Sequence, residues 1–221
     1  MTSIPIDLKN KALKTPKINA AVVCPNEESV LLAVKEAKEI NLINPILIGK
    51  KSLIEKTANQ VNLEINSYNI IEINNEQEAA TVACKLAHED KVKIIIKGNL
   101  HTDILMRYYL KKEFNLIVGR RLSHIWHMTA QKFNKPLFIT DGALNVLPRV
   151  EIKLQILKNA VDFCNKLNIF KPKVAILSGT EDPIDSMPSS IEAQKVMELA
   201  NKENVDALVH GPLAFDNAIS E

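Results

Sequence analysis

The chain has few cysteines, few aromatic residues and no long apolar run. Its three cysteines, Cys24, Cys84 and Cys164, lie far apart, and none has C-x-x-C spacing. An odd number of isolated cysteines argues against a disulfide framework and a zinc site, so we interpret them as small buried apolar side chains. No apolar stretch approaches a membrane span, and the first residues lack the pattern of a signal peptide. We therefore expect a cytoplasmic protein with no membrane partner.

An excess of one charge sign is also absent. The 28 Lys and Arg residues and 26 Asp and Glu residues give a formal net charge of +2, without a basic tail or stripe. This balance excludes nucleic acid as an expected partner. At 221 residues the chain is long enough for one or two globular domains.

Strand and helix patterns alternate through about the first half of the sequence. Short apolar runs are separated by stretches with apolar residues at i, i+3 and i+4, which predicts a mostly parallel sheet covered by helices on both faces. Ser52 and Glu55 have the S-x-x-E spacing of a capping box and predict the start of one of these helices. The four expected strands cover residues 19–24, 45–48, 70–73 and 93–96.

The pattern changes at Leu122. Two strands separated by the polar stretch Gln131 to Lys135 predict a hairpin. We place a domain boundary in the Gly- and Pro-containing connection that follows, giving an N-terminal α/β domain over residues 1–145 and a partial second α/β domain over 146–221. The later elements are expected at residues 122–128 (strand), 137–140 (strand), 150–167 (helix), 173–177 (strand), 190–201 (helix) and 207–209 (strand).

Polar residues follow the ends of the predicted strands. Ligands of open α/β sheets bind at the carboxyl ends of the strands, so these residues predict one anion-accepting cleft. We name as candidate substrate-binding residues Lys97, Gly98, His101, Thr102, Arg107, Arg120, Ser123, Asp141 and Asn145.

Several of these candidates also have an ordinary structural interpretation. Gly98 would allow either a close approach of two backbone segments or a simple turn at the end of a strand. Lys97 could be a solvated surface lysine, and Thr102 could be the N-cap of the following helix. Of the adjacent Arg120 and Arg121, one could reach the cleft while the other is solvated, because alternate strand residues face opposite sides.

Two catalytic or metal roles are not favoured. Ser123 and His124 are adjacent on a strand and diverge, and no G-x-S-x-G elbow is present, so we assign Ser123 to hydrogen bonding of a ligand. Asp141 lacks the converging carboxylates that a metal would need, so we predict no metal site.

Five segments in register resemble the phosphate acetyltransferase and phosphate butyryltransferase family, and the resemblance covers nearly the whole chain from about Asn19. The family also has an arginine at the position of Arg107, whereas it usually has alanine at the position of Gly142. The segments are Lys97-Gly98-Asn99-Leu100-His101-Thr102, Gly119-Arg120-Arg121-Leu122-Ser123-His124, Ile139-Thr140-Asp141, Met187-Pro188-Ser189-Ser190 and Gly211-Pro212-Leu213-Ala214-Phe215-Asp216-Asn217-Ala218.

The resemblance implies a two-domain fold like that of isocitrate and isopropylmalate dehydrogenases. It implies a phosphate acetyltransferase, which moves an acyl group reversibly between acetyl-CoA and phosphate, with acetyl-CoA and phosphate as substrates. It also implies no separate cofactor, direct transfer without a covalent enzyme intermediate, and a homodimer or other self-association.

Family members continue past the Asp216-Asn217 segment, with a Ser-Arg element and the acidic residue usually proposed as catalytic base. This chain ends at Glu221. We therefore expect a truncated second domain and leave the catalytic residue unassigned.

Three alternatives stay open from the sequence. One is a phosphate butyryltransferase, and another is a non-catalytic remnant or one subunit of a split acyltransferase. A nicotinamide-dependent oxidoreductase shares the predicted architecture, but no G-x-G-x-x-G occurs in the chain.

Overall fold

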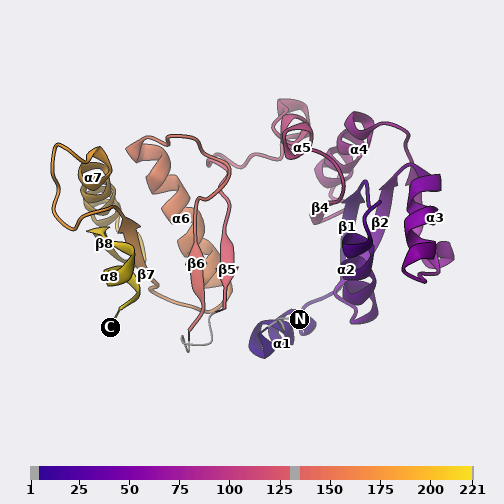
Figure 1. Cartoon of the computed structure of the whole chain (residues 1–221), viewed down its shortest axis with the longest axis horizontal. Coiled ribbons are helices and arrows are strands. Elements are labelled where there is room, and N and C mark those ends of the chain that lie inside the picture. Colours follow the sequence, from indigo (N-terminus) through magenta and orange to yellow (C-terminus); the bar gives the residue numbers. More distant parts are fainter. Residues whose placement is uncertain (1–4, 130–134, 221) are drawn as a thin grey trace. The chain divides into compact units, whose positions relative to one another are not determined.

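The computed structural model describes residues 5–129 and 135–220, and the chain divides into two compact units, Met1–Val118 and Gly119–Glu221. The first unit begins with a helix that the sequence analysis did not predict, and strands and helices then alternate as expected (Figure 1). Its elements are α1 (Ile6–Leu13), β1 (Ile18–Val23), α2 (Glu28–Glu39), β2 (Ile43–Gly49), α3 (Lys51–Gln60), η1 (Ile65–Ser67), β3 (Asn69–Glu72), α4 (Glu76–His88), β4 (Ile94–Lys97), α5 (Thr102–Tyr109) and η2 (Lys112–Phe114).

The four strands of the first unit form one parallel sheet in the order β3-β2-β1-β4. The last four residues of the inner strand β1, Ala20 to Val23, are apolar without alternation and fully buried. A continuous apolar run is what a strand needs when helices cover both faces of a sheet. The α/β fold with a parallel sheet is therefore confirmed.

Helices cover both faces of this sheet. On one face, Leu31 of α2 and Ile54 of α3 pack with Val22 and Leu47. On the other, the fully buried residues of α4 are all small, and its Val82 and Leu86 pack at the edge of the same cluster while only partly buried. The buried residues of this second face are Ala21, Val23, Ile48, Ala79, Ala80, Ala83, Val92 and Leu100.

The capping box predicted at Ser52 and Glu55 is wrong. Helix α3 starts at Lys51, directly after β2, with Lys50 as an N-cap that makes no side-chain bond. Ser52 is therefore already helical, and Glu55 lies 3.8 Å from Lys51 instead. A side-chain cap occurs at α4, where the Asn75 side chain accepts from the backbone N–H of Glu78 at 3.0 Å.

The described part of the second unit contains three helices and the predicted antiparallel strand pair, but its first strand begins at Trp126, so the strand predicted from Leu122 is wrong over residues 122–125. Strands β5 and β6 pair antiparallel, with Trp126 opposite Ile139, and β7 and β8 pair parallel. Residues 130–134, which include most of the predicted polar connection, lie outside the described residues. The elements are β5 (Trp126–Met128), β6 (Leu137–Ile139), α6 (Val150–Lys166), β7 (Lys173–Leu177), α7 (Pro188–Lys202), β8 (Leu208–Leu213) and α8 (Phe215–Ile219).

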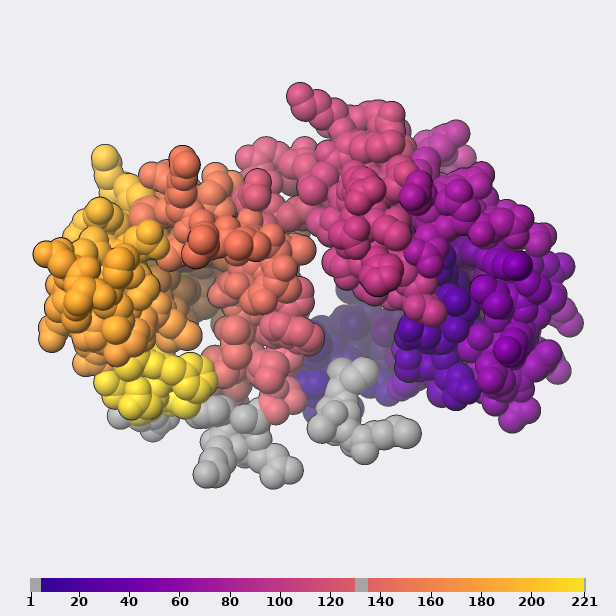
Figure 2. All heavy atoms as spheres, turned by 45° about the horizontal axis from the view of Figure 1, so that its top comes forward, coloured from indigo at the N-terminus to yellow at the C-terminus, as the bar shows by residue number. Residues whose placement is uncertain are grey.

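The core of the second unit lies between α6 and α7. Leu154, Leu157 and Val161 of α6 pack against Val196 and Ala200 of α7. Strands β7 and β8 contact α7, and the short α8 contacts β7, with the yellow C-terminal segment against the orange part of its own unit (Figure 2). A domain boundary after residue 145 stays a prediction.

In the described parts of the chain, every helix is too short or too polar to cross a membrane. Within residues 5–129 and 135–220, no three His, Cys, Asp or Glu side chains gather as a metal site would require.

The three cysteines are free thiols, with Cys84 and Cys164 buried and Cys24 half-buried. Burial, with a smaller contribution from Glu76, raises the pKa of Cys24 to about 11. Burial likewise raises the pKa of Cys84 to about 11, against a smaller lowering by Lys111. Both thiols are therefore protonated at neutral pH and unreactive as nucleophiles.

We expect slow thiol labelling of the native protein. A thiol with a pKa of about 11 is roughly 0.1% thiolate at pH 8, against roughly a quarter for an exposed cysteine, so Cys24 and Cys84 should react about 250-fold more slowly with a disulfide reagent. The same protein in denaturant is the control and should label at all three positions quickly. Fast labelling of one thiol in the native protein would contradict this description.

Candidate anion-binding site

Five of the nine candidate residues form a first cluster on the loop between β4 and α5 and on α5 itself. Strand β4 ends at Lys97, and α5 begins at Thr102, so the intervening loop lies at the carboxyl end of a parallel strand. Strand β4 pairs with β1, which places this loop beside the Cys24 turn. The first cluster consists of Lys97, Gly98, His101, Thr102 and Arg107.

Gly98 is required by the close approach of two backbone segments. Its N–H donates to the Val23 carbonyl at 2.8 Å, and the next N–H, of Asn99, donates to the Cys24 carbonyl at 2.8 Å. A Cβ at Gly98 would lie 2.7 Å from the Val23 oxygen and closer still to the Cys24 oxygen. The glycine thus lets the loop lie directly on the end of β1.

Lys97 holds the loop together, and His101 is the last residue of the loop before α5. The Lys97 ammonium donates to the Leu100 carbonyl at 2.9 Å and to the Gly98 carbonyl at 3.3 Å. His101 is the N-cap of α5, although its side chain makes no capping bond. The N-cap interpretation of Thr102 is therefore wrong, because Thr102 is already the first residue of the helix.

Arg107 projects from the exposed side of α5. It pairs with Asp103 at 3.6 Å, and both side chains are about two-thirds exposed (67% and 69%). A surface pair of this kind contributes about 0.3–0.5 kcal/mol, so a stronger anion would displace Asp103 at little cost.

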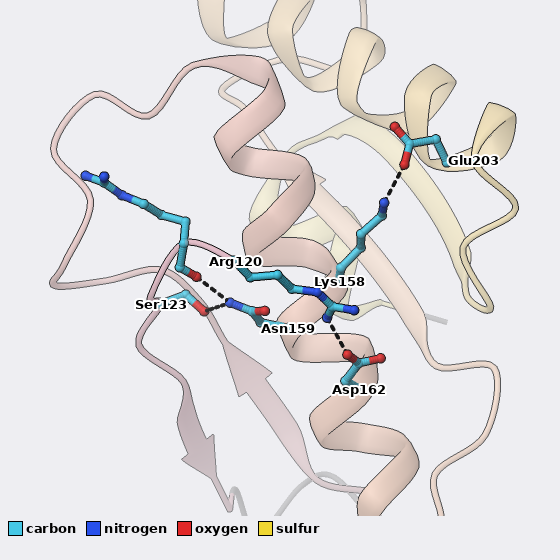
Figure 3. Close-up of polar contacts among 7 residues, drawn as sticks. Arg120, Ser123, Lys158, Asn159, Asp162 and Glu203 are labelled. Atoms are coloured by element: carbon cyan, nitrogen blue, oxygen red, sulfur yellow. Dashed lines mark hydrogen bonds and ion pairs between the residues drawn. The ribbon is translucent and has the colours of Figure 1, made fainter. Parts of the chain in front are cut away.

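The other four candidates form a second cluster in the second unit: Arg120, Ser123, Asp141 and Asn145. The extended segment before β5 is held along α6 by polar side chains of that helix (Figure 3). Asn159 donates to the Arg121 carbonyl at 2.8 Å and to the Ser123 hydroxyl oxygen at 3.0 Å. Arg120 forms an ion pair with Asp162. Ser123 therefore accepts from α6 and keeps its own O–H to donate.

Asp141 organises the loop that follows β6. Its carboxylate accepts from the backbone N–H of His124, Ala143 and Leu144, each at 3.2 Å, and of Asn145 at 3.0 Å. The Asn145 side chain also donates to it. The carboxylate is saturated by its own loop and the neighbouring segment.

The hydrogen bonds decide the charge of Asp141. Partial burial pushes the pKa of Asp141 up, but the bonds from the Asn145 side chain and from backbone N–H groups outweigh burial and lower it below its ordinary value. Asp141 is therefore ionised at neutral pH and serves as an acceptor.

Comparison with known proteins decides the family. A family model described as "Phosphate acetyl/butaryl transferase" matches residues 75–221. The chain is 38% identical over 217 residues to a phosphate acetyltransferase of Rickettsia felis, covering 97% of this chain and 62% of that protein. The chain belongs to the phosphate acetyl/butyryl transferase family.

Other members of the family agree. A phosphate butyryltransferase of Clostridium beijerinckii is 32% identical over 216 residues, covering 97% of this chain and 72% of that protein. The crystal structure of a branched-chain phosphotransacylase from Enterococcus faecalis matches with a TM-score of 0.79 and 28% identity, over 92% of this chain and 71% of that one. The chain thus spans about three fifths of the length of the Rickettsia felis relative.

Sequence reasoning missed the residues that hold the second cluster in place. Gln155, Asn159 and Asp162 all lie on α6, more than 30 positions from the segment that they bind. Their spacing of three to four residues on one side of a helix was the available signal, but it is also the spacing of an ordinary solvated face.

Proposed function

We propose that the chain is a phosphate acetyltransferase, moving an acetyl group reversibly between CoA and phosphate. The observation that carries the proposal is 38% identity to a phosphate acetyltransferase along 97% of this chain. The polar groups at the carboxyl end of β4 and along the segment before β5 are of the kind that anionic substrates require.

In acetyl phosphate formation, a phosphate oxygen attacks the thioester carbonyl carbon. A C–O bond forms, the C–S bond breaks, and the thiolate of CoA leaves and takes a proton from the phosphate. Lys97, the N-terminus of α5 and Arg107 would bind negative charge in the first cluster, while Arg120 and the O–H of Ser123 would do so in the second. Donors of this kind stabilise negative charge on a bound phosphate or on a developing oxyanion. We assign no residue as catalytic base.

We further propose a two-domain architecture like that of isocitrate and isopropylmalate dehydrogenases, with a boundary after residue 145, and a cytoplasmic homodimer. Direct transfer requires no cofactor besides the substrates acetyl-CoA and phosphate.

The second candidate is phosphate butyryltransferase, which the 32% identity to the Clostridium beijerinckii protein supports. The two are separated by measuring phosphate-dependent CoA release from acetyl-CoA and from butyryl-CoA by the purified chain. A higher kcat/KM for acetyl-CoA supports the proposal, and a higher value for butyryl-CoA supports the second candidate. Binding of CoA without phosphate-dependent release would instead support a non-catalytic role.

Arg107→Ala and Arg120→Ala should each weaken binding of CoA or phosphate roughly tenfold or more, because an arginine bonded to a charged ligand contributes about 1.5–3 kcal/mol. Calorimetric titration measures the change, and the melting temperature verifies the fold. Arg149→Ala is the matched control, since Arg149 lies outside both clusters. If both variants bind CoA and phosphate as tightly as the parent, neither Arg107 nor Arg120 contacts these ligands.

A further inference from the structure

Arg120 and Arg121 are neighbours, but their guanidinium groups are held in different ways. That of Arg120 is paired with the carboxylate of Asp162. The Nε of Arg121 donates to the side-chain oxygen of Asn145 at 2.8 Å. Within the described residues the Arg121 guanidinium makes this one hydrogen bond. A guanidinium has five N–H groups, so its four Nη hydrogens stay available.

Asn145 has a single possible orientation. Its side-chain nitrogen donates to the Leu122 carbonyl at 2.8 Å and to the Asp141 carboxylate, and its backbone N–H donates to Asp141 at 3.0 Å. With the amide rotated by 180°, its nitrogen would face the Arg121 Nε donor and its oxygen would face two acceptors. The amide oxygen therefore points at Arg121.

The backbone of Arg121 is fixed as well. Its N–H donates to the Gln155 side chain at 2.8 Å, and its carbonyl accepts from Asn159 at 2.8 Å. Both ends of the side chain are thus anchored, although Arg121 is exposed. An exposed arginine ordinarily loses side-chain freedom when it binds an anion, and anchoring removes part of that entropic cost before binding.

We propose that Arg121 binds a phosphoryl group through its two Nη atoms, and that Asn145 and Asp141 are positioning residues that act through Arg121. This inference rests on the proposed function and adds a ligand-binding residue to it. An arginine whose Nε is already occupied presents its two Nη groups side by side, which is the geometry of a bidentate phosphate contact. Arg120, by contrast, must first break its ion pair with Asp162 before it can bind the ligand.

The phosphoryl group has two possible sources, inorganic phosphate or the phosphates of CoA. Titration with inorganic phosphate, with CoA and with dephospho-CoA separates them. If Arg121→Ala weakens binding of inorganic phosphate, Arg121 lies at the reacting phosphate. If it weakens binding of CoA but not of dephospho-CoA, Arg121 binds the 3′-phosphate. If it weakens binding of CoA and of dephospho-CoA but not of inorganic phosphate, Arg121 binds the pyrophosphate.

The experiment compares the affinities of Arg121→Ala, Arg121→Lys, Asn145→Ala and the double variant, with Arg149→Ala as control. We expect Arg121→Ala to weaken binding about tenfold or more, and lysine to recover only part of the loss because it cannot bind in a bidentate manner. Asn145→Ala should weaken binding in the parent but not in the Arg121→Ala background. A purely structural role for Asn145 would give the same loss in both backgrounds.

The outcomes separate this inference from the proposed function. If the parent binds CoA or phosphate and Arg121→Ala binds it equally well, the inference is overturned and the proposed function stands. A greater loss in Arg120→Ala than in Arg121→Ala would also overturn it. If the folded parent binds neither ligand and transfers no acyl group, the proposed function is overturned, and the inference with it.

Discussion

Gly98→Ala is expected to destabilise the first unit by about 3 kcal/mol or more, because the added Cβ would meet backbone atoms. It would lie 2.7 Å from the Val23 carbonyl oxygen and nearly as close to the Cys24 carbonyl carbon, at 2.8 Å. A flexible side chain could move aside, but these atoms belong to the end of β1. Relief of the clash would break the bonds that join this loop to β1. Urea unfolding measures the change as a lower midpoint.

Gly142→Ala is the matched control for this prediction. A Cβ at Gly142 would lie 3.7 Å from the Trp126 indole nitrogen, which is ordinary contact. The stability should stay within about 1 kcal/mol of the parent, and can rise because alanine restricts the unfolded chain. Equal effects of the two substitutions would show that the loop of Gly98 does not lie on β1 as described.

The second large effect is expected at Asp141. Asp141→Ala removes the acceptor for four backbone N–H groups and for the Asn145 side chain. We expect a loss of about 2–4 kcal/mol, since several donors lose their partner at once and only some can turn to water. Asp185→Ala, on an exposed loop, is the control and should change stability by less than about 0.5 kcal/mol.

The contribution of Asp141 should also depend on pH in a defined direction. Its folded pKa is lowered, so the stabilisation is fully present above the unfolded value of about 3.9 and is lost as the pH falls through the lower folded pKa. The stability difference between parent and Asp141→Ala should therefore be constant from pH 7 to 5 and shrink below about pH 4. A difference that instead shrank between pH 7 and 5 would contradict a lowered pKa.

The elements were predictable where the signal is local. The apolar run predicted from Asn19 to Cys24 became β1 from Ile18 to Val23, because a buried parallel strand needs nothing but apolar residues in sequence. The helix predicted from Val150 to Leu167 was likewise correct to within one residue. The capping-box prediction was wrong because the spacing of Ser52 and Glu55 carries no information on where the preceding strand ends, and α3 begins one residue earlier, at Lys51.

The candidate site was predictable only in part, because its key contacts are distant in sequence. The first cluster is nearly contiguous, so the end of β4 and the start of α5 alone place it. In the second cluster, the contrast between Arg120 and Arg121 depends on Asp162, 42 positions away, and on Asn145, 24 positions away. The sequence-based argument from strand alternation does not apply, because β5 begins only at Trp126 and both arginines precede it. Their difference follows instead from which partner lies beside each guanidinium.

The amide of Asn145 lies between an acid and a base, and this has an electrostatic consequence. A carboxylate bonded directly to the guanidinium of Arg121 would neutralise much of its charge and would compete with any incoming anion. The Asn145 amide is held by the Asp141 loop and in turn holds the Arg121 Nε, so neutral hydrogen bonds alone fix the position of the guanidinium. The arginine is thus oriented without being neutralised, and its full positive charge stays available to an anion.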